Sequence, residues 1–183
     1  MLDWSSRESQ FLRFEILAQE IRQCLGTASF RLLDVGCGLA ELHGYLQGRG
    51  LPVEYTGVDL TPAILNEARR RHPDLDLREV DVFATPQPFP DHSFDVVFCS
   101  GVFNLRQDNS LLFAQHGLAR LTALASRLAA VNFLHTRTIE QYPECCYFAP
   151  EELLDCAKRP DTTVTVRDDY LDKDFTIFAR YSH

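Results

Sequence analysis

Short apolar runs alternate with stretches rich in helix-forming residues along most of the chain. Apolar runs that predict strands lie at 30–35, 53–58, 75–80, 94–99 and 127–134. Helices are predicted at 5–25, 39–48, 62–71 and 110–126, with a short one near 150–158. Strands that read as nearly continuous apolar sequence are buried on both faces, and helical connections between them indicate a parallel sheet. The pattern therefore predicts an α/β fold with helices on both faces of the sheet.

Two further strands are predicted near the C-terminus, at 162–168 and 174–181. Only a few residues around Leu171–Lys173 join them, which is too short for the crossover that parallel neighbours require. The pair is therefore expected to form an antiparallel hairpin. The predicted fold class is a doubly wound, mostly parallel seven-stranded sheet with a C-terminal antiparallel hairpin.

Two helix starts carry recognisable signals. Ser5 and Glu8 have the spacing of a capping box at the start of the first helix. Thr61 stands at the N-cap position of the helix at 62–71, and Pro62 is its first residue.

Composition limits the classes of partner. The chain has 183 residues, is 45% hydrophobic and has a formal net charge of −8. Because an acidic chain repels polyphosphate backbones, we expect no nucleic-acid partner. No signal peptide and no apolar run of transmembrane length is seen, so we expect no membrane partner. The six cysteines form no Cys-x-x-Cys pair, which favours free thiols in a cytoplasmic protein and predicts no metal site.

A glycine turn follows the first strand in the stretch "RLLDVGCGLAELHGYL". Gly36 and Gly38 let the backbone approach a ligand at the carboxyl end of the strand, where doubly wound sheets bind nucleotides. Asp34 and Glu41 flank the turn, however, and two carboxylates would repel a pyrophosphate. They favour a ligand with positive charge, and S-adenosylmethionine carries an ammonium and a sulfonium but no phosphate.

Two more carboxylates end the next two strands. Asp59 closes "YTGVDL" and is placed to accept hydrogen bonds from ribose hydroxyls, a feature shared by NAD and S-adenosylmethionine sites. Asp81 lies in "REVDVF" and is placed to accept the adenine amino group, with Val82 and Phe83 forming an apolar wall. The sequence therefore predicts a nucleoside site at this edge of the sheet.

Four segments, "LLDVGCG", "YTGVDL", "EVDVF" and "FDVVFCSGVFNL", occur in this order at the predicted strand ends. Together they resemble the successive motifs of class I S-adenosylmethionine-dependent methyltransferases, whose seven-stranded sheet has an antiparallel last strand. The resemblance implies one methyltransferase domain over 1–183. Residues 1–28 would form an N-terminal helix that covers the substrate, and 29–183 a Rossmann-like core.

The resemblance also implies a set of cofactor-binding residues for S-adenosylmethionine and its product S-adenosylhomocysteine. They are Asp34, Gly36, Cys37, Gly38, Asp59, Leu60, Asp81, Val82, Phe83, Ser100 and Gly101. The chain departs from the common motif at Ala40, where a third glycine is frequent, and we expect only a slight change in packing there.

The acceptor is less well defined by the sequence. The Asn/Asp-Pro-Pro motif of amino-directed nucleic-acid methyltransferases is absent after the strand at 94–99, so a small-molecule acceptor is expected. His135 follows the strand at 127–134 and is the candidate general base. Candidate substrate-binding residues are Arg13, Phe103, Asn104, Tyr142 and Tyr147. Arg7 and Arg13 are also candidates to bind a carboxylate of cofactor or acceptor.

The predicted reaction is an in-line displacement at the methyl carbon, accelerated largely by alignment of donor and acceptor. Three alternatives stay open. The first is another chemistry on S-adenosylmethionine, such as aminocarboxypropyl transfer or cyclisation. The others are an NAD-dependent oxidoreductase and a non-catalytic binding subunit. The oligomeric state is open as well.

Overall fold

The computed structural model describes residues 7–182. Its helices are α1 (Arg7–Leu25), α2 (Glu41–Gly48), α3 (Pro62–Arg71), α4 (Ser110–Leu124), the 3₁₀ turn η1 (Pro150–Glu152) and α5 (Leu154–Ala157). Its strands are β1 (Phe30–Val35), β2 (Val53–Asp59), β3 (Asp76–Glu79), β4 (Phe94–Cys99), β5 (Ala125–Leu134), β6 (Thr162–Arg167) and β7 (Asp174–Tyr181).

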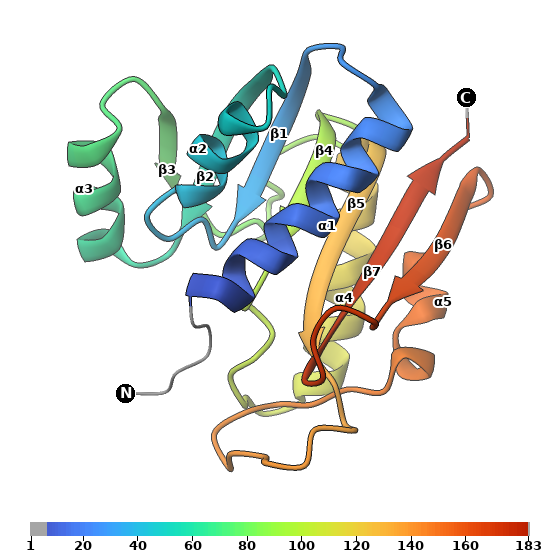
Figure 1. Cartoon of the computed structure of the whole chain (residues 1–183). Coiled ribbons are helices and arrows are strands. Elements are labelled where there is room, and N and C mark those ends of the chain that lie inside the picture. The colour runs from blue at the N-terminus through green and yellow to red at the C-terminus, as the bar shows by residue number, and fades with distance from the viewer. Residues whose placement is uncertain (1–6, 183) are drawn as a thin grey trace.

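The strands form one seven-stranded sheet in the order β3-β2-β1-β4-β5-β7-β6 (Figure 1). Strands β1 to β5 pair in parallel, whereas β7 runs antiparallel to both β5 and β6. From β1 the chain continues to β2 and β3 on one side and then crosses to β4 on the other side, so the strand order reverses between β1 and β4. Doubly wound sheets bind their ligands at this point. The predicted fold class, including the C-terminal antiparallel hairpin, is confirmed.

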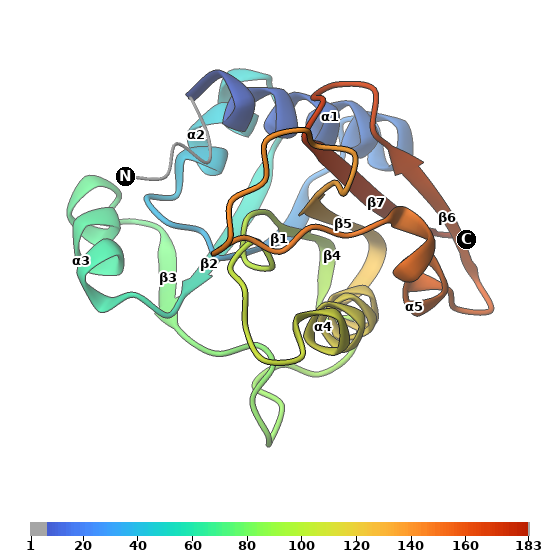
Figure 2. The same cartoon turned by 90° about the horizontal axis from the view of Figure 1, so that it is seen from below.

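Helices cover both faces of the sheet, with α1 and α2 on one face and α4 and α5 on the other (Figure 2). Successive side chains of β1 lie on opposite faces of the sheet, as in any strand. Leu32 packs in the core under α1, with Leu17 and Ile21, while Leu33 packs in the core under α4, with Leu118. The apolar runs are therefore strands that contribute side chains to two hydrophobic cores, one on each face of the sheet.

Several predicted bounds differ from the structure. Helix α4 ends at Leu124, and the chain passes directly into β5 because Ala125 already has extended backbone and pairs with Phe94 of β4. The helix predicted near 150–158 is divided into η1 and α5.

The two predicted helix starts have different outcomes. Ser5 lies outside the described residues, so the capping box with Glu8 stays a prediction. Thr61 is the N-cap residue of α3, but its side chain makes no capping hydrogen bond. Its backbone N–H donates to Asp59 Oδ1 at 2.9 Å instead. The predicted N-cap position of Thr61 and the helix start at Pro62 are confirmed.

None of the helices between residues 7 and 182 combines the length and apolar character that crossing a bilayer requires. All six cysteines are free thiols, as the sequence predicts.

Candidate functional site

Two adjoining pockets lie at the carboxyl ends of the parallel strands. The larger, of about 430 Å³, is lined by residues that follow β1, β2, β3 and β4. The smaller, of about 170 Å³, lies between the glycine turn, the end of β4 and helix α1. Gly36, Ser100 and Gly101 line both pockets, so the two form one continuous site.

Most of the predicted cofactor residues come together here. The larger pocket is lined by Gly36, Asp59, Leu60, Asp81, Val82, Phe83, Ser100 and Gly101. Asp34 and Cys37 line the smaller pocket. Gly38 lines neither, but its N–H donates to Asp59 Oδ2 at 3.0 Å and so shapes the turn that borders them.

The Asp59 carboxylate links two loops. Its Oδ2 accepts the Gly38 N–H of the turn after β1, and its Oδ1 accepts the Thr61 N–H of the turn after β2. Each carboxylate oxygen keeps a further lone pair, which can accept another hydrogen bond. Asp81 also accepts a backbone hydrogen bond, since its Oδ1 accepts the Phe83 N–H at 2.9 Å.

Gly36 is required by both backbone geometry and space. Its φ of +73° lies in the left-handed region, and a Cβ added there would meet Val102 Cγ2 at 2.5 Å. The absence of a side chain lets the loop after β4 close over the glycine turn.

We expect Gly36→Ala to lower the free energy of unfolding by about 1–3 kcal/mol, because it adds left-handed strain to a steric clash. Urea denaturation measures the change. Gly44→Ala is the control, since nothing lies within 4 Å of a Cβ at this helical position. Equal stability of the two variants would contradict the prediction.

Ala40 and Glu41 differ from their expected roles. Ala40 is fully buried with φ +59°, a conformation that favours glycine, so the departure from the common motif affects the backbone and not only packing. Glu41 lines a separate pocket with Arg7 and His72. Of the two carboxylates predicted to flank the ligand, only Asp34 therefore lies in the site.

Asp34 is almost fully buried on the wall of the smaller pocket. The Tyr55 hydroxyl donates to its Oδ2 at 2.6 Å. Burial raises the pKa of Asp34 to about 7, the Tyr55 hydrogen bond opposes this rise, and the nearby Asp59 charge adds to it. The carboxyl group thus changes its charge near neutral pH.

Arg13 reaches the smaller pocket from α1. Its Nη1 lies 2.8 Å from Asp174 Oδ2, and the two side chains are only 9% and 1% exposed. Within residues 7–182, Arg13 Nε and Asp174 Oδ1 have no hydrogen-bond partner, and the same holds for Asn104 Oδ1. Arg13 and Asn104 both line the pocket, so this end retains unused hydrogen-bonding capacity.

The other predicted site residues lie elsewhere. Phe103 is buried and packs behind the larger pocket, 5.9 Å from the Phe83 ring. Tyr142 is 52% exposed, and its N–H donates to the Tyr147 hydroxyl at 3.0 Å. Neither tyrosine lines the two pockets.

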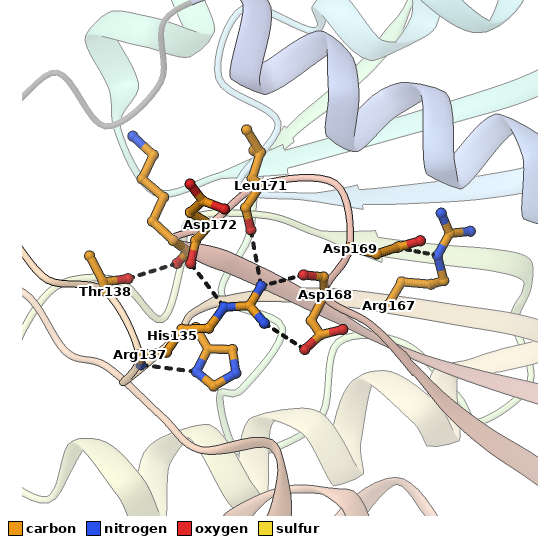
Figure 3. A network of polar contacts seen from close by, with 9 residues as sticks. His135, Arg137, Thr138, Arg167, Asp168, Asp169, Leu171 and Asp172 are labelled. Carbon is orange, nitrogen blue, oxygen red and sulfur yellow. Dashed lines mark hydrogen bonds and ion pairs between the residues drawn. The ribbon is translucent and has the colours of Figure 1, made fainter.

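His135 also lies outside both pockets, in a polar network beside the β6–β7 connection (Figure 3). Its Nδ1 accepts the Arg137 N–H at 3.2 Å, and its ring packs 5.2 Å from that of Phe175. Burial and the Arg137 charge lower the pKa of His135. A general-base role for His135 stays a prediction.

Arg137 organises that network. Its guanidinium donates to Asp168 Oδ2 at 2.7 Å, to Asp172 O at 3.0 Å and to Leu171 O at 3.3 Å, and also to the Asp168 carbonyl (Figure 3). These bonds fix the β6–β7 connection to the loop after β5.

The sequence did not identify Tyr55 or Asp174. Tyr55 lies inside β2, where it looks like an ordinary aromatic strand residue. Asp174 is 161 residues from Arg13 in the chain, so no local pattern connects the two.

A family model for the methyltransferase domain matches residues 33–122. The fatty-acid O-methyltransferase of Mycolicibacterium smegmatis is 43% identical over 67 residues, which are 37% of this chain and 24% of that relative. A Mycobacterium tuberculosis protein whose name assigns it to the methyltransferases is 28% identical over 158 residues, 82% of this chain and 93% of the relative. The match to the first relative is thus confined to about a quarter of its length.

Among solved structures, magnesium protoporphyrin IX methyltransferase of Synechocystis PCC 6803, with bound S-adenosylhomocysteine, has a TM-score of 0.71. The alignment covers 97% of this chain and 89% of that structure at 13% identity. At this identity the likeness shows the fold alone.

Proposed function

Because the chain belongs to the class I S-adenosylmethionine-dependent methyltransferase family, we propose that it transfers a methyl group from S-adenosylmethionine to a small-molecule acceptor. The observation that carries the proposal is the charge of the site. The larger pocket contains two carboxylates, Asp59 and Asp81, and no Lys, Arg or His among its lining residues in the described chain. Such walls suit an uncharged nucleoside and oppose a pyrophosphate.

The adenosine part of the cofactor fits the larger pocket. The free lone pairs of Asp59 accept the ribose hydroxyls, while Asp81, Val82 and Phe83 surround the adenine. Leu60, which is 61% exposed, covers the ring from the mouth of the pocket.

The methionine part runs along the glycine turn into the smaller pocket. Asp34 receives the ammonium there, beside Cys37. Gly36, Ser100 and Gly101, which line both pockets, border the sulfonium between the two ends.

When bound, S-adenosylmethionine supplies a methyl group that is already activated by the sulfonium. The chain therefore contributes binding and orientation, which alone can lower the barrier by up to ~7–11 kcal/mol. Asn104 and Arg13 of α1 line the smaller pocket together with the shared residues Ser100 and Gly101, and they are the side chains we assign to the acceptor. In this arrangement helix α1 covers the substrate and the part of the chain that follows it forms the core of a single domain.

The net charge of −8 and the free thiols support two further parts of the proposal. The acceptor is not a nucleic acid, because acidic walls repel phosphates. The protein acts in the cytoplasm, where thiols stay reduced.

Calorimetric titration with S-adenosylmethionine, and with NAD under the same conditions, tests the cofactor. We expect affinity of about micromolar Kd for the first and no binding of NAD. Preferential binding of NAD would overturn the proposal in favour of an oxidoreductase. A screen of acceptors with methyl-labelled cofactor then tests the reaction, and product analysis separates methyl transfer from aminocarboxypropyl transfer or cyclisation.

A further inference from the structure

The buried contact between Tyr55 and Asp34 joins two neighbouring strands at the wall of the smaller pocket. Asp34 of β1 lies opposite Gly57 of β2 in the sheet register, and Tyr55 is two residues before Gly57 on the same face. The Tyr55 hydroxyl reaches over to Asp34 Oδ2 at 2.6 Å. Tyr55 is 6% exposed and Asp34 5%, so water does not compete for this bond.

Gly57 leaves the space that this contact needs. A Cβ at Gly57 would lie 3.0 Å from Tyr55 Cε1, 2.9 Å from Cys37 Sγ and 2.8 Å from Leu77 Cδ2. A side chain here would force Leu77 and Cys37 to move and would press against the tyrosine ring. The sequence "YTG" thus supplies both the hydroxyl and the room for it to reach across.

The pocket wall also shows why Asp34 needs a donor. The titratable groups around it are Tyr55 and Asp59 of β2, Cys37 of the glycine turn, Cys99 of β4 and Arg13 of α1. Burial raises the pKa of both thiols, so they stay neutral. Asp59 repels a charge on Asp34, and the Arg13 charge is balanced by Asp174.

We propose that Tyr55 is a positioning residue for the cofactor, whose hydroxyl binds the Asp34 carboxylate and orients it toward the methionine ammonium. The inference rests on the proposed function and adds a residue that does not itself line the pocket. Tyr55 occupies Oδ2, and we assign Oδ1 to the ammonium.

This role predicts a specific pH dependence. An ammonium binds the ionised form of Asp34, so binding is strongest above the pKa of that group and weakens as the pH falls through about 7. For the wild type we expect about tenfold weaker binding at pH 6 than well above pH 7, with one proton released per ligand at the lower pH. Removing the Tyr55 hydroxyl takes away a bond that lowers the pKa of Asp34, so the midpoint moves to higher pH.

The experiment is calorimetric titration of the full chain with S-adenosylhomocysteine between pH 6 and 8, in two buffers of different ionisation enthalpy. This product lacks the labile methyl group and carries the same amino-acid end. For Tyr55→Phe we expect the midpoint of the affinity profile to rise by about one pH unit. Proton release at pH 7 should rise from about one half per ligand toward one.

Tyr181→Phe is the matched control. It also removes one buried hydroxyl, which donates to Thr122 O at 2.8 Å far from the pocket, and it should keep the wild-type profile. Asp34→Asn, which cannot titrate, should give a flat profile, and this result assigns the midpoint of the wild type to Asp34.

The outcomes separate the two proposals. If the wild type binds neither S-adenosylhomocysteine nor S-adenosylmethionine, the proposed function fails. If the wild type binds but its profile is flat, or if Tyr55→Phe keeps the wild-type midpoint, the role of Tyr55 is refuted while the proposed function stands.

Discussion

Asp59→Ala is expected to weaken S-adenosylmethionine binding by about 100-fold or more. The substitution removes the acceptor of the Gly38 N–H and of the Thr61 N–H, so the turns after β1 and β2 lose their common anchor. It also removes the acceptor that we assign to the ribose hydroxyls. Hydrogen bonds to a charged group contribute about 1.5–3 kcal/mol each, and the loss of more than one gives this magnitude. Calorimetric titration measures the affinity.

Glu79→Ala is the control for Asp59→Ala. Glu79 pairs with Asp59 in the register of β3 and β2, carries the same charge and is exposed outside both pockets. Its removal should change the affinity by less than about twofold, because its side chain is exposed to solvent and lines neither pocket. Wild-type affinity in Asp59→Ala would show that the carboxylate does not bind the nucleoside.

The fold was predictable because its main signals are local. Each parallel strand is an apolar run, and the short connection around Leu171–Lys173 leaves only an antiparallel pairing for β6 and β7. The bounds of α4 were not predictable in the same way. Ala125 is a good helix former, and its pairing with Phe94 of β4 overrides that propensity.

In the candidate site, too, residues placed by local sequence were predictable, whereas contacts that depend on tertiary structure were not. Asp59 and Asp81 follow strand ends directly, so their place at one edge of a parallel sheet follows from sequence order. The contact of Tyr55 with Asp34 depends on register between two strands, and Gly57 is what makes it possible. Register across strands and the spacing of side chains around a turn are tertiary properties, so a reading of local motifs does not contain them.

His135 illustrates the opposite case. It follows β5 at the correct edge of the sheet, but the sheet is wide, and β5 lies two positions from β1 in the strand order. The Arg137 network holds His135 at the β6–β7 connection instead of over the pockets. A residue that follows a parallel strand was thus correctly predicted to lie at this edge of the sheet. It lies close to the cofactor residues, however, only when the strand is β1, β2, β3 or β4.

The buried ion pair between Arg13 and Asp174 leads to the largest stability effect. We expect Arg13→Met to lower the free energy of unfolding by about 3–5 kcal/mol, because it leaves the Asp174 carboxylate buried without its counter-charge. Asp174 is 1% exposed and its Oδ1 already lacks a partner within the described chain. Urea denaturation followed by circular dichroism measures the change.

Arg31→Met is the control, since the Arg31–Asp95 pair lies at the surface with side chains 51% and 26% exposed. Exposed pairs contribute about 0–1 kcal/mol, so this variant should stay close to the wild type. If the two variants lost similar amounts of unfolding free energy, burial of the Arg13–Asp174 pair would not make its disruption more costly than that of an exposed pair.

The double variant Arg13→Met/Asp174→Leu separates folding from binding. Replacing both charges by apolar groups removes the unpaired carboxylate, so the double variant should recover most of the lost stability. If Arg13 serves only to attach α1 to the start of β7, the double variant also recovers the cofactor affinity of the wild type. If the free Nε edge of Arg13 contacts ligand in the smaller pocket, the folded double variant still binds or turns over its ligand more weakly than the wild type. Comparing stability and binding in this one protein therefore decides whether the arginine on α1 belongs to the scaffold alone or also to the site.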